Sequence, residues 1–492
     1  MTGVRRRGKH LGFSCRARFA ILCDESPVGE AAVLEHVVDE QADSVHLVLV
    51  SRPRLEEWLA GCDDGMRRWC RSANFTAEAG AVCLVPGAEG VLAEVLVGTG
   101  DDDDPWLFGH LPAKLPPATY RIDHIPGARS ANWAAIGWML ATYVFGRYKA
   151  RNGRTWPRLE WPRTADRPLV ERIVAATTLV RDMVNTPAAD MGPGDLVAAA
   201  QQLAARHDAA LRVIVGEGLL AEGYPCIHAV GRAAAHARQP RLIDLSWGAP
   251  TAPKVTLVGK GVCFDSGGLD IKPSAGMKLM KKDMAGAAHV LGLAAMIMDA
   301  ALPVRLRVLI PAVENAVSGD AMRPLDVLRT RKGISVEIGN TDAEGRLILA
   351  DCLWEAGRER PDLLIDIATL TGAARTALGP DLPALFANDD ALAADLLEAG
   401  AEQSDPMWRL PLHKGYRRLL DSKVADLSSV SDGPHAGAIT AALFLQEFVP
   451  PGVKWAHLDI MGWNTGARPG RPDGGEAMGL RALYALVQRR FA

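Results

Sequence analysis

Residues 254–268 read Lys-Val-Thr-Leu-Val-Gly-Lys-Gly-Val-Cys-Phe-Asp-Ser-Gly-Gly. The apolar run Lys254–Val258 is short and is followed by glycine, which predicts a buried β-strand that ends near Gly259. Two side chains that can bind a cation, Lys260 and Asp265, follow in a glycine-rich segment, where the backbone can approach a ligand closely. In open α/β sheets, ligands bind beyond the carboxyl ends of the strands. This stretch therefore predicts both a sheet and the edge of the sheet that carries the chemistry.

An alternation of strands and helices extends on both sides of this stretch. Ala-rich helical segments lie between apolar strands, which is typical of a mostly parallel α/β sheet with helices on both faces. Polar residues also follow two further strands, in the segments Gly339–Arg346 and Ala368–Gly372, so we expect three strand ends to meet at one polar edge. The expected strands are Leu211–Val215, Arg241–Leu245, Lys254–Val258, Arg305–Ile310, Ser335–Ile338, Leu363–Ile367 and Lys454–Asp459. The expected helices include Asp195–Arg206, Ala285–Ala300 and Ala438–Phe448.

The first 160 residues predict a smaller N-terminal α/β domain, to which the sequence assigns no role. Short β-like runs at Val45–Val50 and Val91–Val97 are mixed with helical stretches and an acidic run, Asp101–Asp104. The stretch Thr155–Pro168 has the composition of a linker, because its three prolines interrupt regular structure. We therefore expect an N-terminal domain at 1–160 and a catalytic domain at 169–492.

The composition excludes several classes of protein. The chain has 492 residues and a formal net charge of −3, so no global positive field would hold it on nucleic acid or an anionic membrane. No apolar run approaches the ~18 residues needed to span a bilayer. The eight cysteines form no Cys-x-x-Cys pair, which favours a reducing, cytoplasmic location. The basic start, Met1–Arg18, is expected to be a frayed tail because the apolar stretch after it is too short for a signal peptide.

Four carboxylates in glycine-flanked or helix-start contexts form a candidate metal site: Asp265, Asp283, Asp342 and Glu344. Clustered anions repel one another unless a cation lies among them, and two divalent cations would satisfy four carboxylates and a nitrogen donor. Hard oxygen ligands with one amine suit Zn²⁺, Mn²⁺ or Mg²⁺. Alternatively, each carboxylate caps a helix or pairs with a lysine, such as Lys282 beside Asp283. Spacing alone leaves both interpretations open.

Longer strings of sequence carry a resemblance to a known family. The strings are Val258–Gly268, Lys272-Pro273, Met277, Met280-Lys281, Asp283-Met284, Gly286–Ala288 and Asn340–Leu347, with further similarity in Arg181–Pro187, Ala368–Ala373 and Ala436–Ala442. Across about residues 140–490, the chain resembles the leucyl aminopeptidase family of dinuclear metallopeptidases. The resemblance implies an enzyme that releases the N-terminal amino acid from short peptides and uses two divalent metal ions per chain, with Mn²⁺ or Zn²⁺ expected.

The resemblance implies a set of ligands for each metal ion. One ion would be held by Lys260, Asp265, Asp283 and Glu344, and the other by Asp265, Asp342 (side chain and carbonyl) and Glu344. Asp265 and Glu344 would therefore bridge the two ions. Lys260 can bind a metal only as a neutral amine, so the metal must lower the pKa of this amine.

The resemblance also implies two catalytic side chains. Lys272 would stabilise the oxyanion that develops on the scissile carbonyl, and Arg346 would hold a bicarbonate near the bridging water as the proton-accepting group. Spacing alone favours other roles for both residues. Lys272 precedes Pro273 in an expected loop tip, and Arg346 has the pattern of a surface ion pair.

The pocket for the first side chain of the substrate is implied to be lined by Met280, Thr369, Gly372 and Met461. At Met461 the chain departs from the family, in which alanine is usual. Methionine adds heavy atoms to one wall, so we expect a preference for small or unbranched first residues such as Ala or Met. The alternative, that Met461 merely fills core space, stays open. The resemblance further implies a homohexamer whose active sites face an interior cavity.

Other functions are compatible with the same residues. A two-metal phosphoesterase would use Lys272 and Arg346 to clamp phosphate. A regulatory or nucleic-acid-binding role occurs in some bacterial relatives, but the near-neutral charge and the run Asp101–Asp104 argue against nucleic acid as the main partner. A catalytically inactive homologue is disfavoured because every expected position of the active site is filled.

Overall fold

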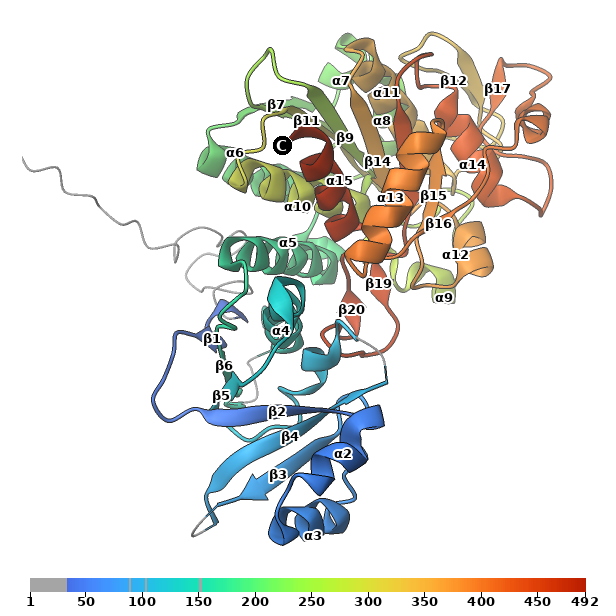
Figure 1. Cartoon of the computed structure of the whole chain (residues 1–492). Helices are drawn as coiled ribbons and strands as arrows, with labels where there is room; N and C mark the ends of the chain where they lie inside the picture. The colour runs from blue at the N-terminus through green and yellow to red at the C-terminus, as the bar shows by residue number, and fades with distance from the viewer. Residues whose placement is uncertain (1–32, 88–89, 102–103, 150–152) are drawn as a thin grey trace, which may run out of the picture.

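Figure 1 shows the computed structural model of the chain, in which residues 33–87, 90–101, 104–149 and 153–492 are described. The basic segment Met1–Arg18 lies outside these residues, and so do Asp102 and Asp103 of the acidic run. Strands of the described residues form a nine-stranded sheet, a six-stranded sheet and two smaller sheets. Among the same residues, no helix combines the length and the apolar character needed to cross a membrane.

The nine-stranded sheet contains the two strands formed by the glycine-rich stretch at residues 254–268. Its strands are β7 (Ala210–Val215), β8 (Arg241–Trp247), β9 (Lys254–Gly259), β10 (Gly261–Asp265), β11 (Arg305–Asn315), β14 (Leu363–Ala368), β15 (Ala384–Ala387), β16 (Trp408–Arg409) and β18 (Trp455–Asp459). The order is β16-β15-β18-β14-β9-β11-β8-β7, and β10 pairs with β11. The centre, from β18 to β11, is parallel, whereas β8 and β15 are antiparallel to these strands.

Helices cover both faces of this sheet, as expected. One face carries α6 (Pro193–His207), α10 (Ala285–Asp299) and α13 (Asp390–Glu402), and α5 (Arg167–Asn185) and α15 (Leu480–Phe491) pack against α10. The other face carries α8 (Pro225–Gly231), α11 (Glu344–Arg358) and α14 (Gly437–Gln446), near the short α7 (Gly218–Ala221). Side chains of the central strands alternate between two apolar cores: Leu257 packs into the first and Val258 into the second. Burial on both faces explains why the central strands are continuous apolar runs, and the expected α/β class is confirmed.

One expected strand belongs to a different sheet. Residues 335–337 form β13 (Ser335–Glu337), but β13 pairs with β12 (Val327–Arg329) and β17 (Leu427–Ser428) in a separate three-stranded sheet. Its carboxyl end is therefore not an end of the large sheet. The segment after β13 still reaches the polar edge, because it leads into α11, which packs against β9 and β11.

The N-terminal domain is built on the six-stranded sheet, in the order β1-β6-β5-β2-β4-β3. The bounds are β1 (Val37–Val38), β2 (Val45–Ser51), β3 (Val82–Pro86), β4 (Leu92–Gly100), β5 (Thr119–Ile122) and β6 (Arg158–Glu160), and only β3 is antiparallel to its neighbour. The proline-rich stretch Thr155–Pro168 thus contributes a strand, β6, as well as the connection to α5. Pro157 and Pro162 flank the strand, and Pro168 lies in the first turn of α5, so at none of these positions is a missing N–H costly.

A buried apolar layer joins the two domains. Helices α2 (Leu55–Ala60) and α3 (Asp64–Ser72) belong to the N-terminal domain, and α4 (Gly127–Ala141) lies between its sheet and α5 (Figure 1). Leu47 of β2, Trp138 of α4 and Val180 of α5 belong to the same core. The buried side chain of Arg181 crosses this layer and donates to the carbonyl oxygen of Leu140 at 3.3 Å.

Candidate metal centre

The chain leaves β9 at Lys260 and enters β10 at once, and glycine on each side allows this close packing. A side chain at Gly259 would place its Cβ 2.5 Å from Cγ2 of Val290, and one at Gly261 would lie 2.7 Å from a carbonyl oxygen of β11. The backbone N–H of Lys260 donates to the carbonyl of Ile367 in β14 at 3.0 Å. The side chain of Lys260 is thereby fixed at the carboxyl end of the parallel strands.

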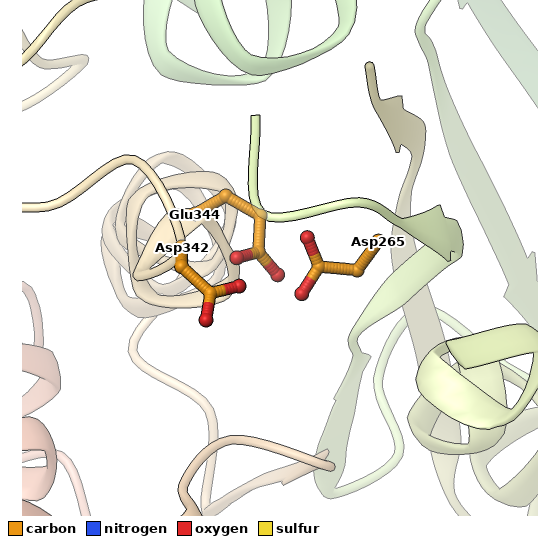
Figure 2. A group of neighbouring side chains, drawn as sticks. All are labelled: Asp265, Asp342 and Glu344. Atoms are coloured by element: carbon orange, nitrogen blue, oxygen red, sulfur yellow. The ribbon is translucent and has the colours of Figure 1, made fainter. Parts of the chain in front are cut away.

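The four predicted carboxylates come together near Lys260 and Lys272. They are Asp265 at the end of β10, Asp283 on the 3-10 helix η7 (Met280–Met284), Asp342 in the loop before α11, and Glu344 as the first residue of α11. Figure 2 shows that the carboxyl groups of Asp265, Asp342 and Glu344 point toward one another, and their oxygen atoms lie within 4.8 Å. The residues that were expected to meet at one polar edge are therefore together.

Two lysine ammonium groups lie among these carboxylates. Nζ of Lys260 lies 2.7 Å from Oδ2 of Asp283 and 2.9 Å from Oε1 of Glu344. Nζ of Lys272 lies 2.8 Å from Oδ2 of Asp265 and also contacts the carboxylate of Asp342. Three of the four carboxylates are buried, so their charges interact with these ammonium groups in a site of low dielectric.

Burial and crowding shift the pKa values of these groups. Burial raises the pKa of Glu344, and the nearby carboxylate of Asp265 raises it further. Burial also raises the pKa of Asp265, with a contribution from Asp283. Burial of Lys260 disfavours its charged form, but the carboxylates of Asp283 and Glu344 outweigh burial and raise its pKa. Burial disfavours the charged form of Asp283 as well, but the charges of Lys260 and Lys282 outweigh burial and lower its pKa, so the positive charge of the site compensates Asp283 more fully than Asp265 or Glu344.

One ammonium group serves two buried carboxylate oxygens. Oδ2 of Asp283 and Oε1 of Glu344 both form ion pairs with Nζ of Lys260. A buried carboxylate oxygen is costly unless a cation or a hydrogen-bond donor lies beside it, so these two oxygens depend on the positive charge at this point. Hard oxygen donors with one amine match a divalent metal. The residues present therefore fit a divalent metal centre.

Two family models match the chain. The model described as the cytosol aminopeptidase family, catalytic domain, matches residues 178–484, and the M17 aminopeptidase N-terminal domain matches residues 45–162. The chain belongs to the cytosol aminopeptidase family. Its members are dinuclear metal-dependent enzymes, and this chain is accordingly a metal-dependent aminopeptidase that acts on peptides.

Individual relatives agree with the family. The crystal structure of the cytosol aminopeptidase from Coxiella burnetii is similar with a TM-score of 0.90 and 48% identity, over 93% of this chain and 100% of that chain. The bottromycin maturation enzyme BotP in complex with Mn gives a TM-score of 0.82 and 36% identity, over 91% and 99% of the two chains. A probable cytosol aminopeptidase from Syntrophotalea carbinolica is 42% identical over 382 residues, 74% of this chain and 76% of the relative. Nothing in these comparisons supports the phosphoesterase or the regulatory alternative.

Arg346, in the first turn of α11, carries its guanidinium group into the interior of the protein. Its side chain is buried, Nη1 donates to the carbonyl oxygen of Ser429 at 2.7 Å, and its Nε has no acceptor among the residues described. Burial lowers its pKa to about 10. The structure shows no ion pair for this side chain within those residues, so the surface ion pair that spacing favoured is not formed.

The four residues implied for the substrate pocket lie in different settings. Thr369 is buried, and its hydroxyl donates to Oδ1 of Asp283 at 2.7 Å. Met280 and Met461 are half-buried, on η7 and in the segment after β18, and Met461 packs against the apolar core. Gly372 is exposed and begins α12 (Gly372–Leu378). The hydroxyl of Thr369 therefore positions a proposed metal ligand, a contact that the sequence analysis missed.

Asn315 is a second residue that the sequence analysis missed. Its buried side chain donates from Nδ2 to Oδ1 of Asp265 at 2.8 Å and to the carbonyl oxygen of Thr341 at 3.1 Å. The same oxygen of Asp265 accepts the backbone N–H of Gly267 at 2.9 Å. Asn315 ends β11, next to β9 in the sheet, so its place at a strand end was a signal that could have found it.

Proposed function

We propose that this aminopeptidase holds two divalent metal ions, Mn²⁺ or Zn²⁺, through one amine and four carboxylates: Lys260, Asp265, Asp283, Asp342 and Glu344. The observation that supports this ligand set is the convergence of these side chains at the carboxyl edge of the parallel strands, where oxygen atoms of Asp265, Asp342 and Glu344 lie within 4.8 Å of one another. When bound, the ions would polarise the scissile carbonyl and lower the pKa of a bridging water. The complex of BotP with Mn supports Mn²⁺ as one candidate.

Lys272 is proposed to stabilise the negative charge that develops on the scissile carbonyl oxygen. Burial disfavours the charged form of Lys272, but its contacts with Asp265 and Asp342 raise the pKa, so the side chain carries its charge at neutral pH. The side chain is 14% exposed and is thus at the open side of the carboxylate group. A fixed ammonium group needs no reorganisation as the charge appears, which lowers the barrier.

Arg346 is proposed to hold a bicarbonate next to the carboxylates. Its guanidinium is fixed on one side by the bond to Ser429, while Nε lacks an acceptor. A planar oxyanion can accept two parallel N–H bonds from such a group. The bicarbonate would then accept the proton of the attacking water and act as the general base.

The ligand set is tested with Glu344→Ala and, as a matched control on the same helix, Glu359→Ala. Glu344 contacts Lys260 and lies among the carboxylates, whereas Glu359 follows the last turn of α11 and is exposed. We expect Glu344→Ala to bind fewer than two metal equivalents per chain and to lose nearly all hydrolysis of leucyl anilide. Full metal content and normal hydrolysis in this variant would contradict the assignment.

The catalytic pair is tested with Lys272→Ala and Arg346→Ala. Neither residue is a proposed ligand, so both variants should keep their metal while kcat falls by about 10²–10³. Restoration of full kcat in Lys272→Ala by added metal would instead indicate that Lys272 is a ligand. Addition of bicarbonate should raise the rate of the native enzyme and leave that of Arg346→Ala unchanged.

Three further properties are proposed for the whole molecule. A homohexamer in the cytoplasm is implied by the resemblance. The cytosol aminopeptidase relatives support the location, and so do the six cysteines among the residues that the structure describes, which are all free. Sedimentation of the purified chain tests the hexamer. The division into 1–160 and 169–492 is supported by the end of β6 at Glu160 and the start of α5 at Arg167.

A further inference from the structure

A cavity of about 260 Å³ lies beside the hairpin formed by β19 (Trp463–Asn464) and β20 (Gly474–Gly475). None of the proposed metal ligands or catalytic residues lines it. Figure 1 shows this hairpin on the side of the catalytic domain that faces the N-terminal domain, and Gly470 of its loop packs against Gly109. Three arginines line the cavity: Arg468, Arg471 and Arg481.

Two of these arginines already have acceptors. Arg468 donates to Oδ2 of Asp381 at 2.5 Å and to Oδ1 of Asn464 at 2.6 Å. Arg481 donates to the carbonyl oxygens of Gln403 and the next residue at 3.2 and 3.0 Å, and lies 3.4 Å from a carboxylate oxygen of Asp405. Both guanidinium groups are therefore satisfied by the protein itself.

Arg471 differs from its two neighbours. In the part of the chain that the structure describes, its side chain forms no ion pair, and its buried Nε has no acceptor. The contact that holds it is with the ring of Trp106, whose centroid lies 4.6 Å from the guanidinium carbon. Burial, together with the nearby charge of Arg468, lowers its pKa. A half-buried cation without an acceptor is costly, so this arrangement favours an incoming anion.

The acidic residues around the cavity do not supply that anion, because each is already engaged. Asp405 accepts the backbone N–H groups of Gly479 and Arg481, each at 2.9 Å. Glu476 pairs with the buried Arg181 at 3.0 Å, outside the set of lining arginines. Asp381 is the partner of Arg468. The lining therefore carries one positive charge, that of Arg471, that is not compensated.

We infer that this cavity is a binding site for a small oxyanion, a carboxylate or phosphate group, with Arg471 as its main ligand. A guanidinium presents a planar fork of N–H donors that matches two oxygens of such a group, and a charge-assisted pair of this kind is stronger than a neutral one. The cavity has room for a group of a few heavy atoms. Because Trp106 belongs to the N-terminal domain and lies against both Arg471 and Arg481, a bound anion would also strengthen the contact between the domains.

Calorimetric titration of the full-length, metal-loaded enzyme tests the site, with inorganic phosphate in one arm and succinate in the other. We expect saturable binding of at least one, weakened by about 10–100-fold in Arg471→Gln. Arg323→Gln, which removes an exposed arginine elsewhere, should bind like the native chain. Arg346→Gln identifies any anion bound at the active site. Binding of phosphate alone would indicate a site for phosphate groups. Binding of both phosphate and succinate would indicate a site that accepts carboxylate groups as well.

A second measurement locates the anion directly. Crystals of the full chain soaked in selenate should show an anomalous selenium peak within hydrogen-bond distance of Arg471. The conservative variant Arg471→Lys should keep part of the affinity, and its melting temperature without anion reports whether it folds. Unchanged affinity in Arg471→Gln, affinity lost only in Arg346→Gln, or an empty cavity in the selenate crystals would overturn the inference.

Discussion

The hydroxyl of Thr369 donates a hydrogen bond of 2.7 Å to Oδ1 of Asp283. The same hydroxyl lies 3.2 Å from the carbonyl oxygen of Asp283, so the two residues are joined at two points. Thr369 follows β14 and Asp283 lies on η7, and the pair therefore connects the sheet edge to the segment that carries a proposed metal ligand. A hydrogen bond to one oxygen of a carboxylate ligand fixes the direction in which the other oxygen points, which for Asp283 is Oδ2.

Replacement of Thr369 by valine should weaken metal binding. Valine keeps the shape of the side chain but removes the donor to Asp283, and loss of such a supporting contact typically lowers metal affinity about 10–100-fold. Thr369→Ser keeps the hydroxyl and should retain most of the affinity. Titration of the metal-free variants with Mn²⁺ measures the difference. Equal affinities in the valine and serine variants would show that the hydrogen bond does not orient the ligand.

Gly345→Ala should disturb the centre although it replaces none of the proposed ligands. A Cβ at this position would lie 2.4 Å from Cε and 2.8 Å from Nζ of Lys260, so the lysine side chain must move away from the carboxylates. Gly319→Ala is the control, because no atom lies within 4 Å of its added Cβ. We expect lower metal content and lower kcat only in Gly345→Ala. A fully loaded and active Gly345→Ala would show that Lys260 is dispensable.

Met461→Ala should change the choice of substrate. If Met461 shortens the pocket for the first side chain, its removal admits bulkier residues, and each methylene of space is worth about 1–3 kcal/mol of discrimination. The ratio of kcat/KM for Phe to that for Ala substrates should therefore rise in the variant. An unchanged ranking of Ala, Leu, Met and Phe substrates would place Met461 in the core, where it also has apolar neighbours.

The stability of the enzyme should depend on pH through His289. This side chain is fully buried, donates from Nδ1 to the carbonyl of Ala285 at 2.6 Å and accepts the N–H of Met478 at 2.8 Å. Burial lowers its pKa to about 4. Below its ordinary pKa of about 6.5, the unfolded chain takes up the proton first, so stability falls as the pH drops from there toward 4.

His289→Gln should remove this part of the pH dependence. Between pH 7 and pH 5, protonation of His289 in the unfolded chain lowers the free energy of unfolding by about 2 kcal/mol, and glutamine takes up no proton in this range. The melting temperature of the native protein should therefore fall further than that of the variant over the same interval. Parallel pH profiles of the two proteins would show that His289 keeps its ordinary pKa in the folded state.

The strands could be predicted from the sequence because each buried strand is a short, continuous run of apolar residues. The stretch Lys254–Val258 is β9, and the side chains of this strand are buried on both faces. The partner of a short strand is not a local property, which is why Ser335–Ile338 was placed with the wrong neighbours. Its partner β17 lies near residue 427, in a segment with only two paired residues and no pattern to reveal it.

The motifs identified the residues that meet at the site, but not the contacts that support them. Lys260 and the carboxylates are brought together as expected, and their roles as ligands stay a prediction. The support from Asn315 and Thr369 depends on how β11 and β14 pack beside β9, which single-sequence reasoning does not give. The burial of Arg346 has the same origin, because α11 carries it inside the molecule.

The order of the strands along the chain sets the order in which the two sheets can form during synthesis. The last strand of the N-terminal sheet, β6, ends at Glu160, before any strand of the large sheet has been made. In the large sheet, β14 pairs with β18, which ends at Asp459, whereas β9 and β10 are complete at Asp265. At about 5–20 residues per second, the ribosome needs roughly 10–40 s to cover that interval. During it the growing sheet exposes an apolar edge, first that of β9 until β14 has been made and then that of β14 until β18 has been made, so this is the period in which the emerging chain most needs protection by a chaperone.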